Sequence, residues 1–144
     1  MSIDIEVYIA PALLTGTISL ALAVYVLRKQ SPVFDTRGLI VSLATSGVVS
    51  FLFAATILAQ EKSVMVLLLN VAFPTILVAA FGLFHFSLAF AGRLDVLTRR
   101  KVLALVALFA GTVGAMWTNR FHGTFRSEVE LYTDPVPMVN AVYG

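Results

Sequence analysis

A short basic segment between two long apolar runs is the feature that most constrains this chain. Residues 92–101 read Gly-Arg-Leu-Asp-Val-Leu-Thr-Arg-Arg-Lys, and apolar runs at 64–90 and 102–117 flank them. Runs of this length are candidates to cross a membrane. Four of the ten Lys and Arg residues lie in this loop, and a short basic loop between two spans stays on the cytoplasmic side. The segment therefore predicts a membrane protein and its orientation.

Composition agrees with a membrane protein rather than a water-soluble one. The 144 residues are 59% hydrophobic and only 12% charged, and the mean hydropathy is +0.93, whereas about a quarter of a soluble domain is charged. The pI of 9.2 suggests nucleic acid at first sight, but the basic residues cluster at span ends, where topology explains them. We expect no nucleic-acid partner. The chain has no Cys, which excludes disulfides, thiolate metal sites and Cys nucleophiles.

The hydrophobic pattern predicts an all-α membrane protein of four transmembrane helices, at about 8–27, 38–59, 64–90 and 101–117, in a single membrane domain of residues 1–144. The N-terminus is acidic, unlike a signal peptide. Counting basic residues at span ends puts both termini outside the cell membrane. The inner set is Arg28, Lys29, Arg37, Arg93, Arg99, Arg100 and Lys101, and the outer set is Lys62, Arg120 and Arg126.

The tail at 118–144 is predicted to be extracytoplasmic. Residues 127–133 alternate polar and apolar side chains, Asp134-Pro135 is typical of a turn, and 138–143 suits a return strand. A short β-hairpin and an irregular tail both remain open.

Small residues at helical spacing predict how the spans pack. Ser42, Ser46, Ser50 and Ala54 recur every four residues, which favours a packing seam in lipid over a polar ligand path. In the fourth span, two further sets of small residues also predict packing seams. These sets are Ala107, Gly111 and Ala115, and Ala110 and Gly114. We therefore expect packing mainly through spans two and four.

Apart from Lys101 at the very start of the fourth span, the spans contain no Asp, Glu, Lys or Arg. Ion-coupled carriers usually need carboxylates within the membrane, a retinal protein needs a buried Lys, and a metal site needs converging ligands. The two histidines, His85 and His122, are predicted on opposite sides of the bilayer. We therefore expect no enzyme, no catalytic residues, no cofactor and no metal.

Two features of the third span are candidate functional positions. His85 is predicted in the inner leaflet, where an ionisable side chain indicates function, although a neutral histidine bonded to a neighbouring helix is the more common case. Pro74 cannot donate to the carbonyl of Asn70, so this turn should open or kink. The kink is either a hinge or a static packing feature.

The end of the fourth span is a further candidate. Trp117 marks the outer interface, and Thr118, Asn119 and His122 follow it. Asn119 can bond the carbonyls that the helix leaves open at its C-terminus. The cluster is either a helix cap or a ligand contact.

Several segments of the chain resemble a known family. The segments are Phe73-Pro74, the aromatic run 81–93 ending in Ala-Gly-Arg, 97–100 (Leu-Thr-Arg-Arg), and Trp117-Thr118-Asn119 with His122-Gly123. Residues 127–131 and 142–144 also look like family positions. Together they resemble the N-terminal seven-helix sensory region of prokaryotic, especially archaeal, sensor histidine kinases, truncated after the fourth helix.

The resemblance implies a multi-pass input module of a two-component system, which passes a stimulus to a cytoplasmic kinase. Helices five to seven, the phospho-acceptor helix and the ATP-binding domain are expected to be absent, as in a fragment or a stand-alone relic, so no kinase activity is expected here. Two alternatives are a small oligomeric transporter or channel subunit, with a water-filled path lined by Ser42, Ser46, Ser50 and Asn70, and a structural membrane fragment. Expected partners are the lipid bilayer, a second copy or a histidine kinase.

Overall fold

The computed structural model describes residues 6–29, 35–59, 61–118, 128–132 and 138–142. It contains four long helices, α1 (Glu6–Arg28), α2 (Arg37–Leu58), α3 (Lys62–Phe90) and α4 (Arg99–Trp117), and a short 3-10 turn, η1 (Leu94–Val96). All four are long and apolar enough to cross a membrane. The predicted spans are confirmed, and each end lies within two residues of the expected position.

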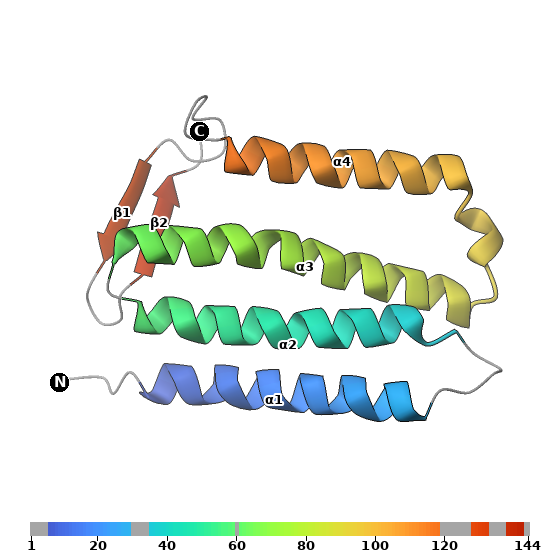
Figure 1. Cartoon of the computed structure of the whole chain (residues 1–144), viewed down its shortest axis with the longest axis horizontal. Helices are drawn as coiled ribbons and strands as arrows, with labels where there is room; N and C mark the ends of the chain where they lie inside the picture. Colours follow the sequence, from blue (N-terminus) through green and yellow to red (C-terminus); the bar gives the residue numbers. More distant parts are fainter. Residues whose placement is uncertain (1–5, 30–34, 60, 119–127, 133–137, 143–144) are drawn as a thin grey trace.

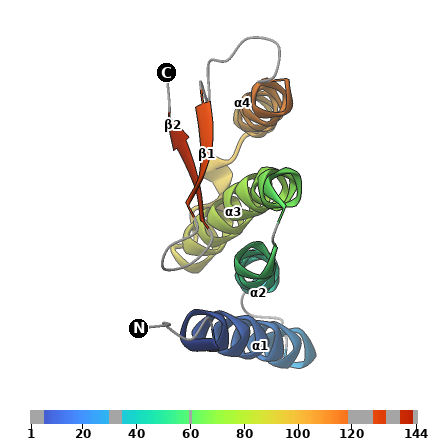
Figure 2. The same cartoon turned by 90° about the vertical axis from the view of Figure 1, so that its left-hand side faces the viewer.

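The four helices form a single row rather than a closed bundle (Figures 1 and 2). α1 packs on α2, α2 packs on α3, and α4 lies at the far side of α3. α2 and α3 make the most extensive contact, whereas α4 makes only a sparse contact with α3. Many large apolar side chains are consequently exposed on both sides of the row, including Leu14, Phe53 and Leu108. Lipid is the solvent that suits such a surface.

A two-stranded antiparallel hairpin follows α4. Strand β1 (Glu128–Tyr132) pairs with β2 (Met138–Val142), and Glu128 is opposite Val142. Figure 1 shows the hairpin beside the beginning of α3, at the same end of the row as the start of α1 and the end of α4. The described part of the tail thus contains the hairpin that the sequence left open.

The basic loop after α3 begins with a left-handed glycine. Gly92 has φ 66°, a conformation that costs glycine little. The Arg93 N–H donates to the Leu88 carbonyl at 2.8 Å, and the Gly92 N–H donates to the Ala89 carbonyl at 3.1 Å. This pair of bonds is a Schellman motif, which ends the helix and turns the chain toward α4.

Paired glycines bring α1, α2 and α3 close together. A Cβ added to Gly16 of α1 would lie 3.2 Å from the carbonyl oxygen of Gly47 in α2, and one added to Gly47 would lie 2.7 Å from Leu20 Cγ. Between α2 and α3, a Cβ on Gly38 would lie 2.4 Å from the Gly82 carbonyl oxygen. Backbones approach this closely only where side chains are absent.

The small residues of α4 do not form the predicted packing seams. A Cβ added to Gly111 or Gly114 would meet no atom of the described chain within 4 Å. α4 is the end member of the row, and α3 is the one described helix beside it. The expectation that packing runs mainly through spans two and four is therefore wrong for span four. Glycines of α1, α2 and α3 make the close contacts instead.

Pro74 does not interrupt α3. The helix continues without a break from Lys62 to Phe90 and has Pro74 in its interior. The predicted opening of the Asn70–Pro74 turn therefore does not divide the span into two helices.

Candidate functional site

His85 lies at the crossing of α2 and α3 where Gly38 meets Gly82. A Cβ on Gly38 would lie 3.0 Å from His85 Nδ1, which places the imidazole beside the first turn of α2. Nδ1 is buried and has no hydrogen-bond partner among the described residues. The Gly82 carbonyl and the Phe86 N–H belong to the same crossing. The His85 ring therefore lies at the α2–α3 crossing, at the end of the row that carries the basic loop.

Asn70 and Pro74 lie farther along α3 and do not share a site with His85. Both are half-buried. Fifteen residues separate Asn70 from His85, which corresponds to about 22 Å along a helix at 1.5 Å per residue. The structure therefore divides the candidate residues of the third span between two depths.

Thr118 caps α4. Its hydroxyl donates to the Gly114 carbonyl at 2.7 Å and to the Ala115 carbonyl at 3.3 Å, and its N–H donates to the Gly114 carbonyl at 2.9 Å. Thr118 therefore bonds carbonyls of the last turn of α4. Trp117 is exposed, while Asn119 and His122 lie outside the described residues.

The serine stripe of α2 makes local bonds. Ser50 donates to the Ser46 carbonyl at 3.0 Å, and the Ser42 carbonyl accepts from Thr45 at 3.1 Å. Ser42, Ser46 and Ser50 are half-buried, and Ala54 is 2% exposed. A hydroxyl bonded to its own helix, as at Ser50, does not need a water-filled path. These contacts favour the packing seam over the polar path.

The described residues form a groove elsewhere, between α3 and α4. It has a volume of about 380 Å³ and an apolar lining. Residues from the middle of both helices form it, namely Leu77, Val78, Phe81, Leu105, Val106, Leu108, Phe109 and Thr112. Sequence reasoning missed this groove. The available signal was the spacing of Lys101, Leu105 and Phe109, which places one basic and two apolar residues on a single face of α4.

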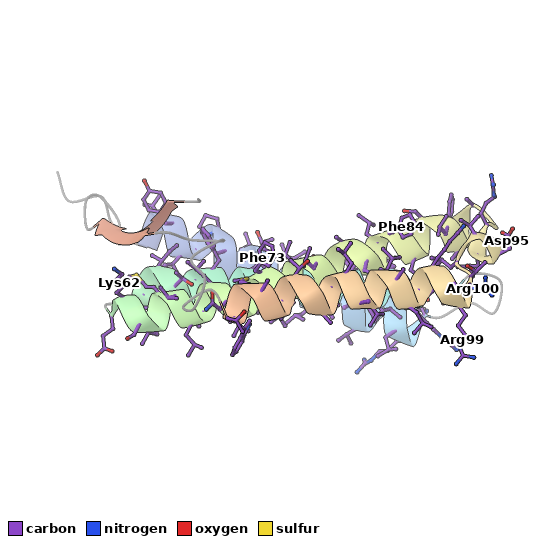
Figure 3. The ribbon with its side chains drawn as sticks, turned by 90° about the horizontal axis from the view of Figure 1, so that it is seen from above. Lys62, Phe73, Phe84, Asp95, Arg99 and Arg100 are labelled. Carbon is purple, nitrogen blue, oxygen red and sulfur yellow. The ribbon has the colours of Figure 1, made fainter. Side chains whose placement is uncertain are left out.

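The described residues hold no group of three His, Asp or Glu side chains that suits a metal ion. The described basic side chains instead lie at the two ends of the row of helices, and most of them lie at one end. Figure 3 shows Arg99, Arg100 and Asp95 at one end of the row and Lys62 at the other. Arg28, Lys29, Arg37 and Arg93 also fall at the first end, because they terminate or begin the helices there.

Four apolar helices in a row, with basic residues at one end, define a multi-pass α-helical membrane protein. Residues 11–144 match the family described as the N-terminal 7TM region of histidine kinase, and the chain belongs to this family. The region is the sensory part of these kinases and not their catalytic part. The chain matches no curated protein and no solved structure.

Proposed function

We propose that this chain is a sensory input module of the cell membrane, without kinase activity of its own, that passes a stimulus to a histidine kinase. The family match over residues 11–144 is the observation that carries the proposal. The four apolar helices and the local bonding of the α2 hydroxyls support it. The partner kinase is either part of the same polypeptide or a separate protein.

The proposed orientation has both termini outside. The unequal number of basic residues at the two ends of the row supports this orientation. Seven basic residues, from Arg28 to Lys101, flank the loops at one end, and Lys62 is at the other. Loops rich in Lys and Arg stay in the cytoplasm. The hairpin and the α2–α3 turn would then face outward.

Topology can be tested directly because the chain has no Cys. Single cysteines at Ser63 and at Asp95 place one thiol in each predicted compartment. An impermeant maleimide added to intact cells should label Ser63→Cys, and it should label Asp95→Cys only after lysis. The reverse pattern would invert the proposed orientation.

The sensory role is tested in the host cell. The locus downstream of codon 144 is sequenced, and any histidine kinase encoded there is followed by phosphohistidine measurement in membranes. Substituting Gly38 by Ala, which disturbs the α2–α3 crossing, should change kinase phosphorylation, whereas Gly111→Ala should not. Phosphorylation that is the same in both variants and in a deletion strain would reject the proposal.

We also propose distinct roles for the candidate residues. His85 would couple α2 to α3 at the cytoplasmic end, because its ring lies against Gly38. Asn70 and Pro74 would shape the middle of α3. Thr118, with Trp117, Asn119 and His122, would terminate α4 at the outer interface. His85→Asn should alter the kinase response, and an unchanged response would leave this histidine with a packing role alone.

A further inference from the structure

The lining of the α3–α4 groove is almost entirely apolar. Thr112 is its single polar lining residue, and the Thr112 hydroxyl already donates to the Leu108 carbonyl at 2.8 Å. The volume of about 380 Å³ falls within the range of ligand sites. Whatever fills the groove at this depth must therefore be apolar.

A basic cluster continues the same face of α4 toward the membrane surface. Arg99, Arg100 and Lys101 form the first turn of α4 and are all exposed. Lys101 precedes the groove residues Leu105 and Phe109 by one and two turns, so the three share a face. At 1.5 Å per residue, Lys101 lies about 6 Å and about 12 Å from them along the axis.

The electrostatics at this position favour an anion. The positive end of the α4 dipole adds to the three cations. The acid in the preceding turn, Asp95, is exposed and offsets only one charge. An apolar slot that leads to a cationic surface matches a molecule with one anionic head and a long apolar chain.

We propose that the α3–α4 groove binds an anionic phospholipid, whose acyl chain lies along the groove and whose phosphate contacts Lys101, with Arg99 and Arg100 beside it. Basic sites next to transmembrane helices bind anionic headgroups. Free phosphate would leave the apolar groove unfilled, and a zwitterionic headgroup would bring a cation to the cluster. The proposal goes beyond the proposed sensory role and does not depend on it.

The chain offers a matched control for the headgroup. Arg28 also ends a helix on the basic side, but it belongs to α1, at the opposite edge of the row from α4. Arg28→Gln and Lys101→Gln therefore remove the same charge at similar depth, and only one of the two lies in line with the groove. A second matched pair of variants tests whether the acyl chain occupies the groove. Val106→Trp fills the groove, whereas Leu14→Trp adds the same ring to the exposed face of α1.

The experiment is native mass spectrometry of the full chain in detergent, after incubation with equal amounts of phosphatidylglycerol and phosphatidylcholine of the same chain length. The unmodified chain should retain phosphatidylglycerol in excess. Lys101→Gln should lower this preference about fivefold, since one basic residue near an anionic headgroup contributes ~1 kcal/mol. Arg28→Gln should not change it. Val106→Trp should reduce retention of both lipids, Leu14→Trp should not, and added inorganic phosphate should displace neither.

Three results would overturn the proposal. Equal losses in Lys101→Gln and Arg28→Gln would show diffuse attraction without a site. Unchanged retention in Val106→Trp would show that the groove is not occupied by lipid. A disulfide-linked dimer of Leu108→Cys in native membranes would show that a second copy covers the groove. Circular dichroism checks that each variant is helical, and Leu105→Phe, a smaller change, replaces Val106→Trp if that variant is not.

Discussion

The first three helices and α4 use the same residue type in opposite ways. Every glycine of α1, α2 and α3 lies at a helix crossing, where an added Cβ would approach a neighbouring helix to within 3.0 Å or less. A Cβ added to either glycine of α4 would meet no atom of the described residues within 4 Å. Small residues allow close packing only where a neighbouring helix lies against them. A small-residue stripe therefore indicates that a helix can be approached closely and does not identify the partner.

The place of each helix in the row explains why the glycines of α1–α3 are in close contact and those of α4 are not. α2 lies between two helices and buries Ala54 to 2% exposure, whereas α4 has one neighbour and leaves Leu108 68% exposed. The open surface of α4 and the paired surfaces of α1–α3 thus predict opposite responses to similar substitutions.

The largest effect is expected at the α2–α3 crossing. An alanine at position 38 would place its Cβ 2.4 Å from the Gly82 carbonyl oxygen and 2.7 Å from the Phe86 nitrogen. Both are backbone atoms and cannot move aside by changing rotamer. Gly38→Ala should lower the free energy of unfolding by about 3 kcal/mol, at the upper end for overpacking. Titration with sodium dodecyl sulfate in mixed micelles measures this change. If Gly38→Ala and Gly111→Ala changed the free energy of unfolding equally, the close contact of α2 and α3 at Gly38 would be contradicted.

The second-largest loss of stability is expected at Met65. Its side chain is fully buried at 0% exposure near the start of α3. Met65→Ala should cost about 2 kcal/mol of unfolding free energy, the lower end for a buried Met, because lipid itself is apolar and the transfer part of the cost is small. Leu67→Ala, at a position 54% exposed, is the control and should change the same titration little. Equal losses would show that Met65 is not packed as the structure has it.

The sequence predicted the spans accurately because long apolar runs bounded by charge have a single plausible structure in lipid. It predicted the helix partners less well. The spacing of Gly111 and Gly114 is the same whether or not a neighbour exists, and only the three-dimensional structure shows that none of the described residues covers them. His85 was singled out as an ionisable side chain within a span, but its position beside Gly38 depends on how α2 and α3 meet, which no local pattern records.

A substitution at Gly114 tests whether this face of α4 is uncovered. Alanine is a better helix former than glycine by about 1 kcal/mol, and an added Cβ at position 114 meets nothing within 4 Å among the described residues. Gly114→Ala should therefore raise the unfolding free energy by up to about 1 kcal/mol in the same titration. A clear loss of stability instead would mean that another helix packs on this face of α4 in the membrane.

The smallest effect is expected at the end of α4. The Thr118 hydroxyl donates to the Gly114 carbonyl at 2.7 Å, but water at the interface can replace it, so Thr118→Val should cost only about 0.5 kcal/mol. Thr118→Ser keeps the hydroxyl and should match the unmodified chain. Amide hydrogen exchange over 114–118 reports the fraying more sensitively than global unfolding. If kinase phosphorylation changes in Thr118→Val while exchange does not, the end of α4 that carries Thr118 contacts a ligand, and its role is not limited to capping the helix.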